Sequence, residues 1–280
     1  MKSRKLEQTI HTKLTRDDDY SAYLQLEKLL GAQRPLSVPP HHDEMLFIIQ
    51  HQIAELWMKL LIHEFQRAIF WMQQDGLPPA LKNLGRARQV QSQLYNQWKV
   101  LDTLTPSEYA EFRHVFGKAS GFQSVQYRLL EFMLGNKSRA MLRVYEHQSE
   151  GHARLVAALE APSLYDELLL HLARIGLPVP DAVVARDFSR LREADDTVVT
   201  VLKTVYENRK KYWMQYEMCE ALMDIESNLQ FWRFHHLKTV ERVIGHKPGT
   251  GGSSGVPFLK KALDIELFPE LIRVRTEIGA

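Results

Sequence analysis

The sequence predicts an all-α fold, built as one large helical bundle around long core helices. Two stretches, residues 42–74 and 195–244, place apolar side chains at helical spacing rather than at the two-residue spacing of a strand. No stretch combines alternating polar and apolar residues with a hairpin turn, and no motif recurs at a fixed period. A sheet and a repeat protein are therefore both excluded, and the two long helices are suited to the core of a bundle.

The composition indicates a soluble protein with one main core. A chain of 280 residues with 45% hydrophobic content can bury a large core, and we expect an N-terminal arm over residues 1–17 followed by one all-helical domain over residues 18–280. A formal net charge of +2 argues against nucleic acid as a partner. The single cysteine, Cys219, excludes an internal disulfide and fits a reducing compartment. No apolar leader or membrane-length apolar run is evident, so we expect a cytoplasmic protein without a membrane partner.

The first helix is expected over about residues 18–30. Three aspartates, residues 17–19, favour a helix start because carboxylates stabilise the positive end of a helix dipole. Gly31 would end the helix. Its aromatic face either enters the core or is lent to a partner subunit, and the sequence pattern leaves both open for Tyr20, Tyr23 and Leu24.

The long helix over residues 42–74 is expected to be buried. Asp43 and Glu44 open it, and apolar side chains cover much of its circumference. His51 lies in one apolar stripe, one turn after Phe47. Taken alone, such a histidine is more often structural than functional.

The next helices bring candidate ligand-binding side chains. One helix runs from Pro79 through Trp98 to about residue 101, and a capping box at residues 105–108 starts a short helix. That short helix places Tyr109 and Arg113 on one face, where a phenol and a guanidinium could bind one carboxylate. An isolated arginine is usually a surface residue, so the pair is suggestive only in combination with other residues.

The remaining segments complete the helical pattern. Ser120 is expected to cap a helix over 121–134, residues 137–194 to form a peripheral helical insertion, and residues 195–244 to form a long helix with a break or kink. A shorter helical tail follows over 257–280.

Two adjacent histidines, His235 and His236, lie near the end of the stretch 195–244, and in a helix they point in different directions. His236 shares a stripe with Val240 and Val243, whereas His235 lies with Lys238 and Arg242. His236 is therefore expected to point inward. Neutral imidazole binds iron, zinc and copper, although an inward histidine is by itself more often a core residue.

A glycine-rich loop, residues 249–255, follows this helix. It lacks the lysine of a phosphate-binding loop and the preceding strand of a dinucleotide fingerprint. The loop backbone can still approach a ligand closely, and Thr250 offers a hydroxyl to a carboxylate. A mobile surface loop is the alternative.

An all-α bundle with inward histidines is typical of a di-iron carboxylate site or a haem site. Only one Glu-x-x-His sequence, residues 111–114, is present, where a di-iron site needs two. No Cys-x-x-Cys-His motif and no Gly-x-Ser-x-Gly elbow occurs, which disfavours covalent haem and a serine hydrolase. Non-covalent haem with one axial histidine remains.

Three motifs in order resemble the tryptophan 2,3-dioxygenase family: the run His42-Asp43-Glu44-Met45-Leu46-Phe47-Ile48 with His51-Gln52 and Glu55-Leu56-Trp57, then Ser120-Gly121-Phe122-Gln123-Ser124, then Gly249-Thr250-Gly251-Gly252-Ser253-Ser254-Gly255. The similarity extends from about Tyr20 to the C-terminus. It implies an all-helical homotetramer in which each subunit binds haem b and uses O2 to cleave the indole C2–C3 bond of L-tryptophan, giving N-formylkynurenine.

The resemblance also implies site residues. His236 would be the proximal iron ligand, His51 would bind the indole nitrogen, and Phe47 would pack on the indole. Substrate carboxylate and ammonium would be bound by Arg113, Tyr109 and Thr250. The haem pocket would be lined by Trp98, Ser120 and Gly121, and a neighbouring subunit's site would receive Tyr20, Tyr23 and Leu24.

One segment departs from the family pattern. Before the first long helix the family usually reads Leu-Thr-Tyr-Gly-x-Tyr-Leu, and here Tyr20-Ser21-Ala22-Tyr23-Leu24 lacks the glycine. Two alternatives therefore stay open: a relative that inserts one oxygen atom into a substituted tryptophan, and a haem-binding sensor without turnover. The indole substituent, the pathway and the oligomeric state are not encoded in any motif.

Overall fold

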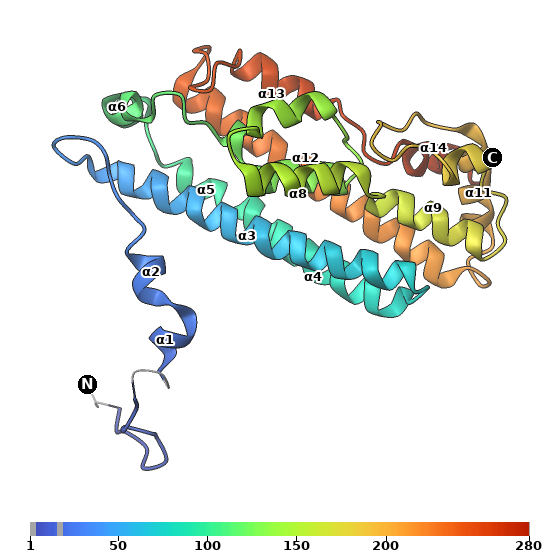
Figure 1. The fold of residues 1–280 in the computed structure, drawn as a ribbon, viewed down its shortest axis with the longest axis horizontal. Helices are drawn as coiled ribbons and strands as arrows, with labels where there is room; N and C mark the ends of the chain where they lie inside the picture. The colour runs from blue at the N-terminus through green and yellow to red at the C-terminus, as the bar shows by residue number, and fades with distance from the viewer. Residues whose placement is uncertain (1–3, 16–18, 280) are drawn as a thin grey trace.

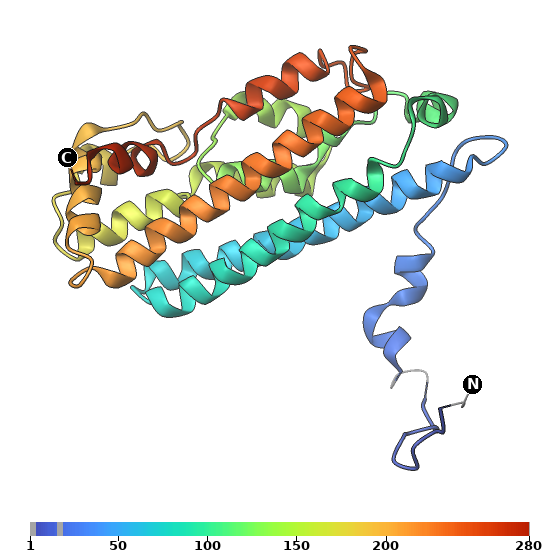
Figure 2. The same ribbon diagram turned by 180° about the vertical axis from the view of Figure 1, so that it is seen from behind.

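The computed structural model describes residues 4–15 and 19–279, and within them the fold is all-α, without a strand. Three long helices form its frame: α3 (His42–Gln73), α4 (Leu77–Asn96) and α12 (Trp213–Ile244). Helix α4 packs along α3 on one side and along α12 on the other (Figures 1 and 2). The expected bundle is confirmed.

Shorter helices complete the bundle. Their bounds are α1 (Tyr20–Leu24), α2 (Leu26–Leu30), α5 (Trp98–Leu101), α6 (Pro106–Phe112), η1 (Arg113–Phe116), η2 (Gly121–Gln123), α7 (Val125–Met133), η3 (Arg139–Tyr145), α8 (Ser149–Glu160), α9 (Leu164–Arg174), α10 (Asp181–Val184), α11 (Asp196–Glu207), α13 (Val256–Leu263) and α14 (Pro269–Glu277). The break predicted within residues 195–244 is confirmed, because α11 ends at Glu207 and α12 begins at Trp213.

The segment 137–194 does not lie at the periphery, contrary to the sequence-based expectation. Helix α9 packs against α3, and its Leu164, Leu168 and Leu172 are fully buried in the same core cluster as Phe65 of α3. The prolines of this segment lie between its helices, and Pro180 is the N-cap of α10. The insertion is therefore an integral part of the bundle.

Buried ion pairs fix α12 against α7. Arg233 of α12 donates from Nη2 to Oε1 of Glu131 at 3.0 Å, and both side chains are buried. Arg128 of α7 forms a second pair with Glu131. Because an unpaired buried charge is strongly destabilising, this cluster constrains the turn of α12 that directly precedes His236.

Helix α3 is long and apolar enough to cross a membrane, with an 18-residue window of mean hydropathy 1.3, the one such helix among the described residues. In this structure it packs against α4, α7 and α9. Glu64 of α3 is buried and is paired with Arg86 of α4 at 2.8 Å. These contacts bury one face of α3, whereas only 22% of its apolar window is buried in the single chain, so the expectation that the whole helix is buried is wrong.

The N-terminal segment projects from the bundle (Figure 1). The helix predicted over 18–30 is divided into α1 and α2, because Gln25 between them adopts a left-handed conformation with φ of 52°. Asp19 caps α1 through the Ala22 amide at 2.7 Å, whereas residues 17 and 18 lie outside the described part. Gly31 ends α2 as expected.

The helix predicted over 121–134 is also divided. Ser120 caps only the short turn η2, and Ser124 caps α7 by accepting a hydrogen bond from the Tyr127 amide at 3.1 Å. Two consecutive capping serines therefore direct the chain around a corner before the helix starts. This corner lies against the glycine-rich loop.

Candidate active site

One wall of the candidate site is the inward face of α12 around His236. The imidazole stacks on Trp98 with ring centroids 5.0 Å apart and an interplanar angle of 12°, and it contacts Trp232 at 5.4 Å. Among the described residues neither ring nitrogen of His236 has a hydrogen-bond partner. Burial, together with the charge of His51, lowers the pKa of His236 to about 4, so the ring is neutral at pH 7 and keeps a free lone pair.

His235, the adjacent residue, faces a different part of the molecule. Its ring packs on Tyr95 with centroids 4.5 Å apart, on the outer side of α4 and α12. Helical phase thus separates the two histidines as predicted, although both are half-buried. Only His236 faces the tryptophans.

The opposite wall comes from α3. The ring of His51 lies 4.1 Å from that of Phe47, and its Nδ1–H donates to the Phe47 carbonyl at 2.7 Å. This bond selects the tautomer in which Nε2 is an unprotonated acceptor. Burial lowers the pKa of His51, with the Phe47 bond and the Glu55 charge opposing the shift, so Nε2 stays an acceptor at neutral pH.

The two walls lie near each other. The charge of His51 acts on His236, and His51 itself is solvent-accessible although protein atoms desolvate it. A side chain that is surrounded by protein atoms and still accessible to solvent is typical of the lining of a recess. Apolar side chains complete the recess: Phe47 stacks on Phe116 at 4.7 Å and belongs, with Trp232, to the residues packed against a buried cluster of Trp98, Leu101, Leu104 and Phe112.

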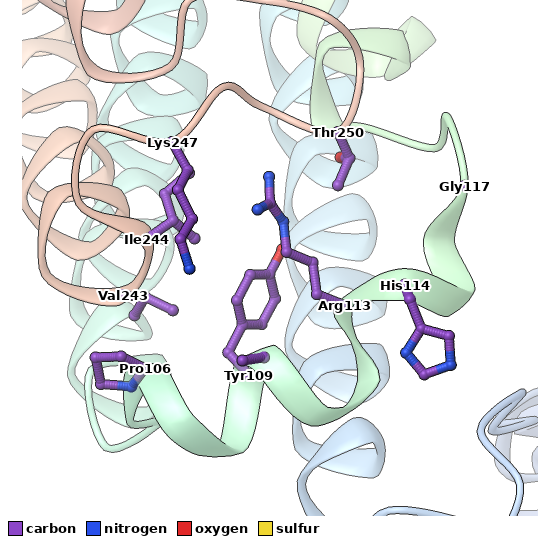
Figure 3. A pocket seen from close by; sticks show the side chains of 10 residues that line it. Pro106, Tyr109, Arg113, His114, Gly117, Val243, Ile244, Lys247 and Thr250 are labelled. Atoms are coloured by element: carbon purple, nitrogen blue, oxygen red, sulfur yellow. The ribbon is translucent and has the colours of Figure 1, made fainter.

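Helix α6 supplies the polar end of the site. The predicted capping box is confirmed: the Thr105 amide donates to Glu108 at 2.8 Å, and the Glu108 amide donates to the Thr105 hydroxyl at 3.3 Å. The short helix places Tyr109 and Arg113 in one pocket of about 440 Å³ (Figure 3). Burial raises the pKa of the Tyr109 phenol, which therefore remains a hydrogen-bond donor.

The glycine-rich loop closes the same pocket through two hydrogen bonds. Arg113 Nη2 donates to the Pro248 carbonyl at 2.5 Å, and the Thr250 hydroxyl donates to the Ala119 carbonyl at 2.6 Å. At Gly251 an added Cβ would lie 2.7 Å from the Cβ of Ser120. Glycine is therefore required at this contact, which brings Ser120 and the loop together.

Of the predicted site residues, Tyr109, Arg113 and Thr250 line the pocket, ring contacts join Phe47 to His51 and Tyr109 and join Trp98 to His236, and Ser120, next to Gly121, lies against Gly251 of the loop. It does not bring in the three residues of α1. Tyr20 and Tyr23 are 74% and 85% exposed, and α1 lies away from the bundle (Figure 1). Within one chain, Tyr20, Tyr23 and Leu24 are thus outside the site.

Sequence reasoning missed three residues that the structure places here. Trp232 lies one turn before His236 on α12 and contacts it. The four-residue spacing between the two could have predicted this contact from the sequence. Phe116 stacks on Phe47, and Lys247 lines the pocket beside Arg113. Neither carries a local sequence signal, because both lie beyond a helix end where periodicity gives no direction.

The arrangement places four chemical functions near one another, and Phe47 links them through ring contacts with His51 at 4.1 Å and Tyr109 at 5.8 Å. The four functions are an unpaired neutral imidazole at His236, an acceptor nitrogen at His51, an apolar aromatic wall at Phe47, and a cation with hydroxyls around Arg113. Together they suit a planar aromatic ligand with an N–H group and a carboxylate, held beside a metal-centred cofactor.

Comparison with known proteins identifies the family. Residues 5–203 and 179–278 match the family model described as tryptophan 2,3-dioxygenase. A tryptophan 2,3-dioxygenase of Serratia proteamaculans (strain 568) is 55% identical over 280 residues, with 100% of both chains covered. Proteins of the same name from Kineococcus radiotolerans and from Xanthomonas campestris pv. campestris (strain B100) are 53% and 55% identical, covering 99% of this chain and 97% and 93% of their own. The chain therefore belongs to the tryptophan 2,3-dioxygenase family.

Proposed function

We propose that the chain is a haem-dependent dioxygenase that cleaves the indole C2–C3 bond of L-tryptophan with O2 and releases N-formylkynurenine. The observation that supports the proposal is the proximity of His236 to His51, and of His51, through Phe47, to the Tyr109–Arg113 pocket. This arrangement occurs in a chain whose full-length relatives bear the name tryptophan 2,3-dioxygenase.

The residues around His236 fit haem b. A haem iron requires a neutral imidazole, and the unpaired His236 with its pKa of about 4 meets that requirement. Trp98 Nε1 is buried without a hydrogen-bond partner, so a donor beside the imidazole is available to a polar group of a bound cofactor. The backbone at Gly121 is open, since an added Cβ would meet nothing within 4 Å. When bound, the haem supplies the redox chemistry for the reaction with O2.

The chain's own side chains would bind and orient the substrate. His51 Nε2 would accept the indole N–H, while Phe47 packs on the indole ring. Arg113 would bind the carboxylate, with Tyr109 and Thr250 contributing their hydroxyls. Fixing both ends of the amino acid sets which indole face meets O2, which is catalysis by orientation more than by proton transfer.

We further propose a cytoplasmic homotetramer in which α1 completes a neighbouring subunit's site. Helix α3 carries an exposed apolar stripe, formed by Met45, Ile49, Ile53 and Leu56, and the aromatic side chains of α1 are also exposed. Apolar stripes of this kind on a soluble protein mark subunit interfaces. The cytoplasmic location rests on Cys219, a buried free thiol suited to a reducing compartment.

The reaction is tested by product mass. Haem-loaded, reduced protein is supplied with L-tryptophan and ¹⁸O2, and the product is expected to carry two labelled atoms. One labelled atom would instead support single-oxygen insertion, and no product with any tested tryptophan would support a sensor.

The shared site is tested by complementation. Deletion of residues 1–31 and the substitution His236→Ala should each abolish activity in a homogeneous preparation. Mixing and reassembling the two variants should restore activity if α1 acts in the neighbouring subunit. If the mixture stays inactive while its subunits exchange, α1 acts within its own chain.

A further inference from the structure

Lys247 is a cation of the pocket to which no role has yet been given. It lines the pocket with Tyr109, Arg113 and Thr250, and Figure 3 shows its side chain extending into the same space as theirs. In the described part of the chain its ammonium group has no hydrogen-bond or ion-pair partner. The positive charge of Lys247 therefore faces the pocket and has no ion-pair partner among the described residues.

The backbone holds Lys247 in this position. Gly245 ends α12 with φ of 60°, and the Lys247 amide then donates to the Ile244 carbonyl at 3.3 Å. On the other side Gly255, with φ of 69°, packs so closely that an added Cβ would lie 2.6 Å from the Lys247 carbonyl oxygen. Two glycines in conformations that L side chains rarely adopt therefore fix the residue that carries the amine.

The charges of the pocket do not balance with substrate alone. Its lining includes Arg113 and Lys247 but neither an aspartate nor a glutamate. L-Tryptophan brings one carboxylate, which the Arg113 group would bind, and one ammonium, which Lys247 would repel. With substrate bound the pocket therefore keeps an excess of positive charge that a second anion could neutralise, and no lining residue supplies that anion.

Haem b carries two carboxylates. Helix α12 bears His236 and ends at Ile244, so Lys247 lies three residues beyond the end of the helix that carries the proposed iron ligand. Val243, which also lines the pocket, is two turns beyond His236, or roughly 10 Å at the rise of a helix. Resting on the proposed haem function, we propose that Lys247 binds a carboxylate of the haem at the edge of the substrate pocket.

This pairing gives Lys247 a role in both affinity and selectivity. It neutralises one cofactor carboxylate as a point charge, and it removes the repulsion that a free lysine would exert on the substrate ammonium. Lys247 is exposed at the pocket mouth, so the pair is screened by salt, and its loss should weaken haem binding by about fivefold at low ionic strength.

The test measures cofactor affinity without turnover. Apoprotein is titrated by absorbance with haem b and with haem dimethyl ester, whose carboxylates are uncharged, for wild type, Lys247→Met and Lys247→Arg. The matched control is Lys210→Met, at an exposed lysine outside the pocket. Lys247→Met should bind haem b about fivefold more weakly at low salt, with the difference lost in high salt and absent for the ester. Lys247→Arg and Lys210→Met should resemble wild type.

Each other outcome overturns the proposal. Equal weakening for haem and ester would make Lys247 a packing residue, and unchanged haem affinity with weaker L-tryptophan binding would make it a substrate clamp. Unchanged affinity for both would leave it without a binding role. If wild type binds neither haem nor its ester, the proposed haem function fails as well, which distinguishes the two failures.

Discussion

Two neighbouring histidines on α12 have different surroundings because consecutive helical residues point about 100° apart. His236 contacts Trp98 and Trp232, whereas His235 packs on Tyr95. His236→Ala should lower haem affinity by at least about 100-fold because it removes the axial ligand. His235→Ala should leave that affinity within about twofold of wild type. Absorbance titration of apoprotein measures both, and equal losses would show that the ligand is wrongly assigned.

His51 should act on the substrate rather than on the cofactor. Its Nδ1–H is bonded to the Phe47 carbonyl, so only Nε2 remains to accept the indole N–H. His51→Phe keeps an aromatic ring but removes the acceptor, and it should lower kcat/KM for L-tryptophan by about tenfold.

The control substrate is 1-methyltryptophan, which has no indole N–H. Its turnover relative to wild type should change less than that of L-tryptophan, and haem affinity should stay constant. A loss of equal size for both substrates would argue for a role of His51 in O2 chemistry instead.

The sequence could predict residue positions only where a helix sets direction. Helical periodicity predicted that His236 points inward before any residue in contact with it was known. The prediction was possible because α12 is one uninterrupted helix around that residue. Lys247 lies beyond the end of α12 and Phe116 lies in the short turn η1 after α6, where direction depends on tertiary contacts. The orientation of Lys247 is set by Gly245 and Gly255, and only the folded backbone shows which carbonyl Gly255 meets.

At the scale of elements, capping signals were the most reliable guide. The Thr105 box starts α6 as predicted because both of its hydrogen bonds are local. Two capping serines, Ser120 and Ser124, lie close together, and sequence alone could not decide which one starts the helix. The burial of α9 was missed for a different reason. Its leucine pattern predicts one apolar face, but only the folded structure shows that α3 covers this face.

Helix α8 is capped by a buried lysine whose titration should be measurable. Lys137 Nζ donates to the carbonyls of Ala158, Leu159 and Ala161 at 2.6, 3.0 and 2.7 Å. Burial lowers its pKa to about 8, below the value of an unfolded lysine near 10.4. Between these two values the unfolded chain binds more protons than the folded one, so this group makes stability rise with pH.

The expected gain is about 1.5 kcal/mol in the free energy of unfolding between pH 8 and 9.5, relative to the same interval in Lys137→Met. Urea unfolding at several pH values measures both proteins. Because the other titrating groups are shared, the difference between the two curves isolates Lys137. Parallel curves would mean that the lysine is not desolvated in the folded protein.

At the scale of the whole molecule, the exposed stripe of α3 predicts an interface. Ile53 is 38% exposed in the single chain and lies between Ile49 and Leu56. If the proposed tetramer forms through this stripe, Ile53→Glu should reduce it to smaller species in light scattering, because a charge would be buried without a partner. Gln66→Glu, at an exposed position of α3 outside the stripe, is the matched control. A tetramer that survives Ile53→Glu would place the interface elsewhere.

The hydrogen bonds that hold the loop over the pocket have a calorimetric consequence. Arg113 and Thr250 already donate to the carbonyls of Pro248 and Ala119, so a substrate carboxylate exchanges one acceptor for another and adds few new bonds. The heat released at the polar end should therefore be small. The temperature dependence of the binding enthalpy should then come mainly from the indole entering the aromatic recess, so that indole alone reproduces most of the negative heat-capacity change seen with L-tryptophan.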